Sequence, residues 1–136
     1  MGLRGVTFDT GALIALERAI RARTASRTSG VWRAALADGV PITVPSPVVL
    51  EWWRGQHGPA ARLLDGMVVE PLSFKLAQVA GGALAKVPKI DRAPSVIDAV
   101  VVASAAQRAD VVYTGDVEDL QRVSVAAFPS VRILGI

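Results

Sequence analysis

The sequence of 136 residues contains no cysteine and only one histidine. Without thiols the chain can form neither a disulfide nor a cysteine-ligated zinc site, which is consistent with a cytoplasmic protein. The single histidine, His57, lies in a Gly-Gln-His-Gly-Pro segment and is expected at the surface. A catalytic site built on a pair of histidines is therefore excluded. The sequence also lacks a Gly-x-x-x-x-Gly-Lys phosphate-binding loop.

Long uninterrupted apolar runs are missing as well, although 51% of the residues are hydrophobic and the mean hydropathy is +0.41. The two longest runs cover residues 96–106, which include Asp98, and residues 39–50, which include three prolines. Neither reaches the roughly 18–20 apolar residues that a membrane-spanning helix requires. Asp9 and Glu17 interrupt the apolar N-terminal stretch. We therefore expect no membrane span and no signal peptide.

Acidic residues are absent from one stretch in which arginine is frequent. Residues 18–33 contain five arginines and no acid, in a chain with a net charge of +3 and an isoelectric point near 10.0. These arginines are Arg18, Arg21, Arg23, Arg27 and Arg33. A guanidinium group bonds two phosphate oxygens at once, so this stretch suits a phosphate-rich partner. The alternative is an ordinary solvated face of a helix and loop.

Short runs typical of strands alternate with helical patterns along the whole chain. Strands are predicted at residues 3–8, 41–44, 67–69, 111–114 and 131–134. Helices are predicted at residues 11–22, 31–37 with Ser29 as the cap, 46–54, 58–64, 73–85, 95–108 and 116–120. This alternation favours a single α/β domain over residues 1–136, built as a three-layer sandwich with a central, mostly parallel five-stranded sheet flanked by helices.

Four of the twelve acidic residues stand in apolar surroundings without an obvious structural role. The other eight are explained by helix pairing, helix ends or loops: Glu17, Asp38, Asp65, Glu70, Asp91, Asp110, Glu118 and Asp119. Asp9 and Asp116 each follow a predicted strand, Glu51 lies about one turn into a helix, and Asp98 lies in the first turn of another. A carboxylate in apolar surroundings is costly unless it is paired or bound to a metal.

These four acids are expected to face one pocket. The carboxyl ends of parallel strands form the ligand crevice of such a sheet, which places Asp9 and Asp116 there. Four close carboxylates repel one another, and a divalent cation relieves that repulsion. A set of oxygen ligands selects Mg²⁺ or Mn²⁺ over Zn²⁺, and such an ion activates water for attack on phosphorus. The rest of the chain carries 15 basic and eight acidic side chains, as a nuclease requires.

Four segments in order resemble the motifs of PIN-domain ribonucleases: F-D-T-G-A-L-I-A-L-E, V-V-L-E-W-W-R-G, V-I-D-A-V-V-V-A-S-A and Y-T-G-D-V-E-D-L. In length and element order the chain is similar to the VapC toxins of bacterial toxin–antitoxin pairs. The resemblance implies a PIN fold and a Mg²⁺- or Mn²⁺-dependent endoribonuclease that cleaves RNA. It also implies a homodimer that is inhibited by a cognate VapB-type antitoxin.

The resemblance also implies roles for individual residues. It assigns Asp9, Glu51, Asp98 and Asp116 to the metal site, and Thr114 to positioning the last aspartate or a water molecule. Asp119 matches a position that sometimes supports the site, although a simple helix-start role fits equally well. Gly11 departs from the family, which often has a small polar residue there; Thr10 is then the only hydroxyl beside Asp9.

Other interpretations were compared with this one. Asp9-Thr10-Gly11 matches the aspartic protease signature, but that class requires an all-β chain. Haloacid-type phosphatases place a second acid two residues after the first, where this chain has Gly11. A binding module without catalysis remains open, as does a PIN-fold RNA-binding or RNA-processing protein outside a toxin–antitoxin pair. The binding module would have no need for four buried acids.

Two apolar features suggest contacts with other chains. Trp52 and Trp53 are neighbours on a predicted helix, so one is expected in the core and the other is a candidate for the antitoxin groove. The small residues of the helical segment 73–87 would permit close packing in a dimer: Ala77, Ala80, Gly81 and Ala83.

Overall fold

The computed structural model describes residues 5–54, 58–89 and 93–136, so His57 and Asp91 lie outside the described residues. Five strands form one all-parallel sheet in the order β3-β2-β1-β4-β5. Their bounds are β1 Val6–Phe8, β2 Ile42–Pro45, β3 Val68–Glu70, β4 Val111–Thr114 and β5 Ile133–Gly135. All five predicted strands are present, within a few residues of the predicted bounds.

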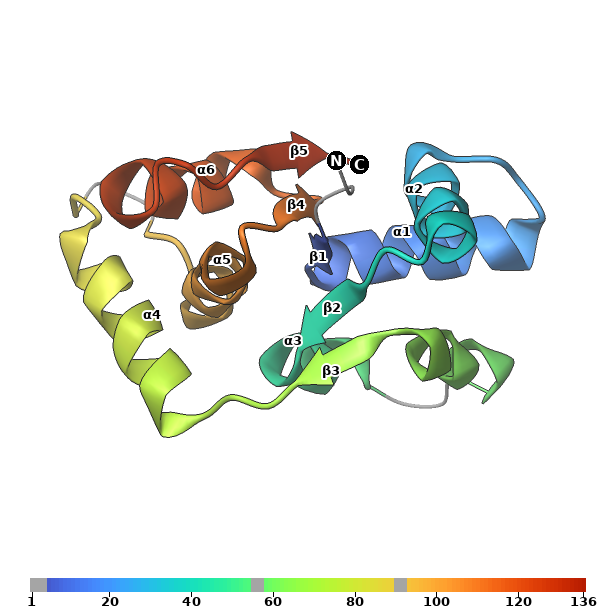
Figure 1. Ribbon diagram of the computed structural model, residues 1–136, viewed down its shortest axis with the longest axis horizontal. Helices are drawn as coiled ribbons and strands as arrows, with labels where there is room; N and C mark the ends of the chain where they lie inside the picture. Colours follow the sequence, from blue (N-terminus) through green and yellow to red (C-terminus); the bar gives the residue numbers. More distant parts are fainter. Residues whose placement is uncertain (1–4, 55–57, 90–92) are drawn as a thin grey trace.

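Helices cover both faces of the sheet (Figure 1). The described helices are α1 Thr10–Ala22, α2 Arg27–Asp38, α3 Ser46–Trp52, the 3₁₀ helix η1 Gly58–Gly66, α4 Phe74–Lys86, α5 Val96–Arg108 and α6 Val117–Ala127. Helices α1 and α2 lie on one side of the strands, and α5 lies on the other side with α4 and α6 around it. The predicted three-layer α/β sandwich is confirmed.

Helix α5 is buried because protein surrounds it. It contacts β1, β2 and β4 of the sheet and packs against α4 and α6. The residues from Ala99 through Ala105 are all buried, which accounts for the apolar character of the helix on every side. Asp98 comes immediately before this buried stretch and is thereby held at the edge of the core.

The start of α2 differs from the prediction. Ser29 was expected to cap the helix, but α2 begins at Arg27 and the cap is Ser26. The Ser26 hydroxyl accepts a hydrogen bond from the Ser29 amide at 3.0 Å, and the Ser29 hydroxyl accepts one from the Ser26 amide at 2.9 Å. This reciprocal capping box makes a helix start at Arg27 more stable than the predicted start at residue 31. The predicted end is confirmed by Gly39, which adopts a φ of 67° after the last turn.

Three other boundaries also differ. Helix α6 was expected to stop near Leu120 but continues to Ala127, because Leu120 and Val123 are fully buried on one face. The short helix predicted at residues 58–64 is present as a 3₁₀ helix that ends two residues later, at Gly66. The last strand begins two residues later than predicted, at Ile133.

One arginine connects several elements at the sheet face under α5. The Arg108 guanidinium donates to Asp110 at 2.9 Å, to Glu70 at 2.7 Å, to Thr7 at 3.1 Å and to Ser104 at 2.9 Å. The Thr7 and Ser104 hydroxyls in turn donate to Asp110 and Glu70. Asp110 is only 4% exposed, so its predicted structural role is confirmed but rests on burial within this network. Removing one partner of such a group leaves a buried charge unpaired.

Two predictions about apolar residues can be compared with the structure. Trp52 is 4% exposed and Trp53 is 49% exposed, and their rings meet edge to face at 5.8 Å. The division between core and surface is thus confirmed. Ala80 and Ala83 are buried inside the chain, where α4 packs on its neighbours, and are not available to a dimer partner.

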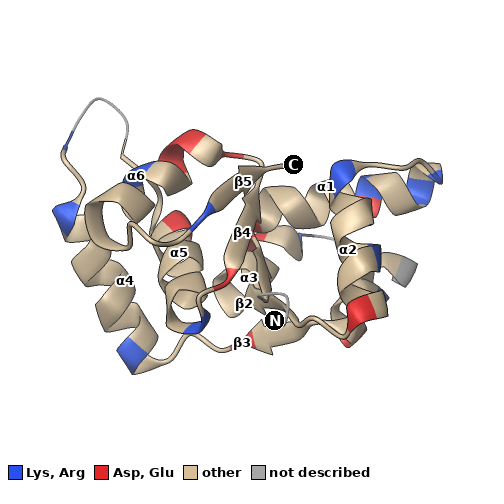
Figure 2. Cartoon of the chain, turned by 45° about the horizontal axis from the view of Figure 1, so that its top comes forward, with Lys and Arg blue, Asp and Glu red and all other residues tan. Residues whose placement is uncertain are grey.

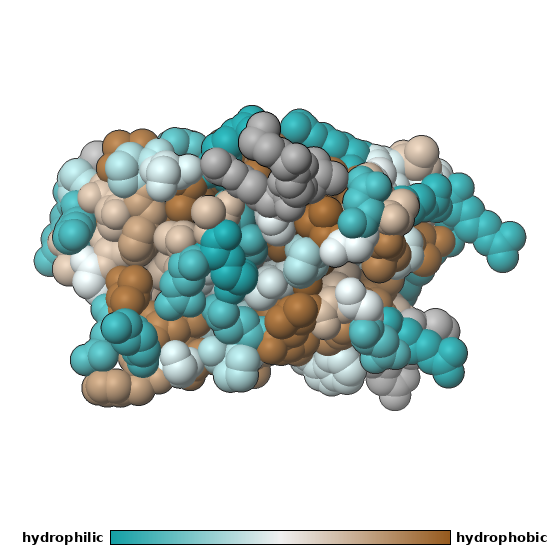
Figure 3. All heavy atoms as spheres, viewed as in Figure 1, coloured by the Kyte–Doolittle hydropathy of each residue, from teal (hydrophilic) through white to brown (hydrophobic). Residues whose placement is uncertain are grey.

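On the face seen in Figure 3, apolar atoms form several patches that polar side chains separate. No helix in the described part of the chain is long and apolar enough to cross a membrane.

Candidate metal centre

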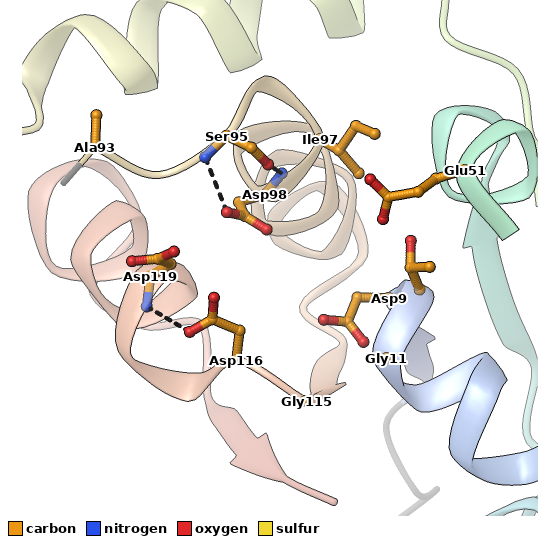
Figure 4. Close-up of a pocket in the computed structure, with 11 residues that line it drawn as sticks. Asp9, Gly11, Glu51, Ala93, Ser95, Ile97, Asp98, Gly115, Asp116 and Asp119 are labelled. Carbon is orange, nitrogen blue, oxygen red and sulfur yellow. Dashed lines mark hydrogen bonds between the residues drawn. The ribbon is translucent and has the colours of Figure 1, made fainter.

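A cavity of about 500 Å³ opens at the carboxyl ends of β1 and β4. All four acids selected from the sequence line it: Asp9, Glu51, Asp98 and Asp116. Figure 4 shows them arriving from four different elements, with Glu51 on α3 facing the three aspartates across the pocket. The structure therefore brings together side chains that are up to 107 residues apart in the sequence. Asp119 also lines this pocket.

Asp9 is held by both of its carboxylate oxygens. It follows β1 and caps α1, where Oδ1 accepts a hydrogen bond from the Ala12 amide at 2.8 Å. Oδ2 accepts one from the Thr114 hydroxyl. Thr114 was expected to position the last aspartate or a water molecule. Its hydroxyl donates to Asp9, and its oxygen accepts the Asp116 amide at 2.8 Å, so Thr114 contacts both aspartates.

Asp98 is fixed by a capping box at the start of α5. The Ser95 amide donates to Asp98 Oδ2 at 2.9 Å, and the Asp98 amide donates to the Ser95 hydroxyl at 3.1 Å. The motif Ser-x-x-Asp at residues 95–98 is a sequence signal for this arrangement. It identifies Ser95 as a residue of the pocket that the sequence analysis treated only as a helix start.

Asp116 and Asp119 form the start of α6. Asp116 is the cap, and its Oδ1 accepts the Asp119 amide at 3.3 Å. The Asp119 carboxylate is 5% exposed and lies 3.8 Å from Arg122. Asp119 thus combines a helix-start position with a place in the pocket lining, and the two roles anticipated for it are compatible.

Burial disfavours the charged form of Asp9. Desolvation raises the pKa of Asp9 above 3.8, more than the hydrogen bonds from Thr114 and from the Ala12 and Gly115 amides lower it. The charge of Asp98 raises the Asp9 pKa further.

Burial also disfavours the charged form of Asp98, and the charges of two neighbouring acids add to the effect. Desolvation raises the pKa of Asp98, hydrogen bonds from Ser95 oppose the rise, and the charges of Asp116 and Glu51 add to it. The acids of the pocket therefore repel one another through space.

The residues present fit a hard divalent cation. The acidic donors of the pocket are all oxygen, and a carboxylate has about four lone-pair sites, of which the three hydrogen bonds to Asp9 leave one for a cation. The described residues that line the pocket include no lysine, arginine or histidine. Among the described residues no three acids meet at one point as a complete metal cluster. Binding would therefore require the carboxylates to draw closer, and a cation would reverse the repulsion that separates them.

Gly11 has a steric function in this site. A Cβ atom at Gly11 would lie 2.9 Å from the Gly115 amide nitrogen and 3.0 Å from its Cα. In the other direction, a Cβ at Gly115 would lie 3.4 Å from the Gly11 Cα. The two backbones thus touch, which holds Asp9 next to the turn that carries Asp116. The position at which the chain departs from its apparent relatives is one where a side chain does not fit.

The sequence matches no protein-family profile and no curated protein sequence. The structure, however, resembles solved structures over nearly its whole length. It matches a chain of the VapBC2 complex of Rickettsia felis bound to promoter DNA, with a TM-score of 0.72, 11% identity and coverage of 96% of this chain and 98% of the other. It matches DNA-bound VapBC of Salmonella typhimurium with a TM-score of 0.66, 14% identity and 98% coverage of both chains.

A third match is VapC20 of Mycobacterium tuberculosis, a toxin that cleaves the sarcin-ricin loop. Here the TM-score is 0.61, the identity 24%, and the coverage 94% of this chain and 99% of the other. The chain has the PIN fold of VapC toxins. The PIN fold expected from the four motifs is thereby confirmed, and the all-β protease interpretation is excluded by the parallel sheet.

Gly11→Ala is predicted to destabilise the protein and to separate the acids. The new methyl group overlaps backbone atoms that cannot rotate away, at a cost of about 1–3 kcal/mol in the free energy of unfolding. Urea unfolding measures this cost. The matched control is Gly81→Ala in α4, where nothing lies within 4 Å of the added Cβ, and alanine should stabilise the helix by about 0.5–1 kcal/mol. Equal effects of the two substitutions would contradict the steric account.

Asp98→Asn is predicted to stabilise the protein in EDTA at neutral pH. A raised pKa means that the folded state favours the protonated carboxyl, so stability is lost as the pH rises from about 3.8 through the raised pKa of Asp98. The amide removes this loss and still accepts the Ser95 hydrogen bond. Thermal unfolding should therefore show a gap between variant and wild type that widens with pH. The control Asp65→Asn, at an exposed carboxylate, should show no such widening with pH. If the wild type became more stable relative to Asp98→Asn as the pH rises, the prediction would be refuted.

Proposed function

We propose that this protein is a Mg²⁺- or Mn²⁺-dependent endoribonuclease and the toxin component of a type II toxin–antitoxin pair. The observation that carries the proposal is the convergence of four acids on one pocket at the carboxyl edge of a PIN sheet. Burial and mutual repulsion act against this arrangement, and a cation compensates for both. The similarity to a VapC toxin that cleaves RNA supports the same conclusion.

Asp9, Asp98 and Asp116 would hold the cation, with Glu51 assisting directly or through water. A divalent cation in this pocket would lower the pKa of a water molecule and neutralise charge at the phosphorus. Thr114 keeps the Asp9 carboxylate in place, since its hydroxyl donates to Asp9 while it also accepts the Asp116 amide. The Ser95 backbone amide likewise donates to the Asp98 carboxylate and holds it. These bonds limit rotation of the ligands before RNA binds.

The five arginines between residues 18 and 33 are all exposed. Figure 2 shows positive charge gathered at the far end of α1 and the start of α2. Arg21 lies 3.7 Å from Glu17, as predicted from their spacing, and Arg27 stacks 5.9 Å over the ring of Tyr113. These five arginines do not line the pocket, so the surface that they form suits phosphates of the RNA that lie away from the scissile bond.

The proposed partners are a VapB-type antitoxin and a second copy of this chain. Two of the similar structures are VapBC complexes with DNA, which supports the antitoxin. Trp53 is half exposed beside the buried Trp52 and offers a rigid aromatic anchor for an antitoxin segment. A PIN-fold RNA-binding or RNA-processing protein outside such a pair is the alternative, and a binding module without catalysis would keep its function when the acids are neutralised.

The proposed function predicts cleavage of RNA that depends on metal and on Asp98. Purified protein should cleave structured RNAs in Mg²⁺ or Mn²⁺ and lose this activity in EDTA. Asp98→Asn should reduce the rate by about 100-fold or more, because a metal ligand is lost. Asp65→Asn removes an exposed carboxylate and should cleave at the wild-type rate. Activity that survives EDTA or the Asp98 substitution would reject the metal-dependent mechanism.

The arginine surface is predicted to contribute to RNA affinity through its charge alone. Replacing Arg23 and Arg27 with alanine should weaken RNA binding and reduce the slope of log affinity against log salt by about 0.7 for each arginine. Fluorescence anisotropy in EDTA measures binding without cleavage. Arg132→Ala, an exposed arginine before β5, is the control and should leave the slope unchanged. A double variant with the wild-type salt slope would show that the RNA lies elsewhere.

A further inference from the structure

One hydroxyl group in the metal pocket has no hydrogen-bond partner. Thr10 is the first residue of α1 and lines the pocket beside Asp9. Its Oγ1 atom is buried, and the described residues supply it with no hydrogen bond. Buried hydroxyl groups nearly always have a partner, because losing water without replacement costs stability. An exception in a catalytic pocket points to a ligand that completes the bond.

The Thr114 and Ser95 hydroxyl groups at the pocket, in contrast, have hydrogen-bond partners within the protein. Thr114 donates to Asp9 and accepts the Asp116 amide. The Ser95 hydroxyl accepts the Asp98 amide. Both groups therefore use their bonding capacity to position acids. Thr10 does neither, although Asp9 is its neighbour in the chain.

We infer that the Thr10 hydroxyl binds the water molecule that attacks the RNA phosphodiester. The inference rests on the proposed function and specifies how its nucleophile is aligned. Glu51 faces the aspartates across the pocket (Figure 4). In the proposed arrangement the water donates one hydrogen to Thr10 Oγ1 and the other to Glu51, which turns a lone pair of the water oxygen toward phosphorus. As the new bond between the water oxygen and phosphorus forms, the bond to the departing ribose oxygen breaks. Glu51 takes the proton from the water, and a solvent proton goes to the departing oxygen.

Thr10→Val tests the inference because it removes the hydroxyl and keeps the shape. With Mn²⁺ and a defined RNA, kcat should fall about 10-fold while KM stays within twofold, because the hydroxyl holds the nucleophile and not the substrate. Thr10→Ser should restore most of kcat. In EDTA the melting temperature of Thr10→Val should not fall, since no bond within the protein is lost. Binding of Mn²⁺, measured by calorimetry, should also be unchanged.

Thr24→Val is the matched control, since Thr24 is exposed at the connection between α1 and α2, and it should leave kcat unchanged. A Thr10→Val protein with the wild-type kcat would overturn the inference. So would a raised KM with unchanged kcat, which would assign the hydroxyl to the RNA phosphate, or a lower melting temperature in EDTA, which would assign it to the fold. Failure of the wild type to cleave RNA with either cation would instead overturn the proposed function and this inference together.

Discussion

The central constraint on the site is the mutual repulsion among partly buried carboxylates that the fold brings together. A parallel sheet directs the carboxyl ends of all its strands to one edge, so acids that follow β1 and β4 cannot avoid each other. Burial raises the pKa of Asp9 and Asp98, and neighbouring acids raise both further. Burial of apolar side chains in the core, to which α5 contributes, offsets this cost.

Local structure then fixes each acid against that repulsion. Three of the four acids selected from the sequence are tied to helix starts: Asp9 and Asp116 as caps, and Asp98 as the third residue of a capping box. Their carboxylates therefore accept backbone amides where the helix dipole favours negative charge. The contact between Gly11 and Gly115 brings two of these helix starts together. The same few hydrogen bonds thus cap the helices and hold the acids, whereas the Thr10 hydroxyl takes part in none of them.

The fold and the four acids could be predicted from the sequence because both depend on local patterns. Alternating apolar runs identify the strands and helices, and an acid in apolar surroundings is conspicuous wherever it occurs. Contacts between distant segments were not predictable in this way. The bond from Thr114 to Asp9 spans 105 residues, and the clash that excludes a side chain at Gly11 comes from Gly115. Asp110 looked like a loop residue because Thr7, which donates to it, lies 103 residues away in the sequence and approaches only in the folded chain.

The most direct test of this account is to locate Mn²⁺ in crystals by its anomalous scattering. The account predicts a peak inside the pocket, about 2 Å from carboxylate oxygens of Asp9 and of at least one of Asp98 and Asp116, and loss of that peak in the Asp98→Asn protein. Mn²⁺ bound only outside the pocket, at concentrations that support RNA cleavage, would contradict it.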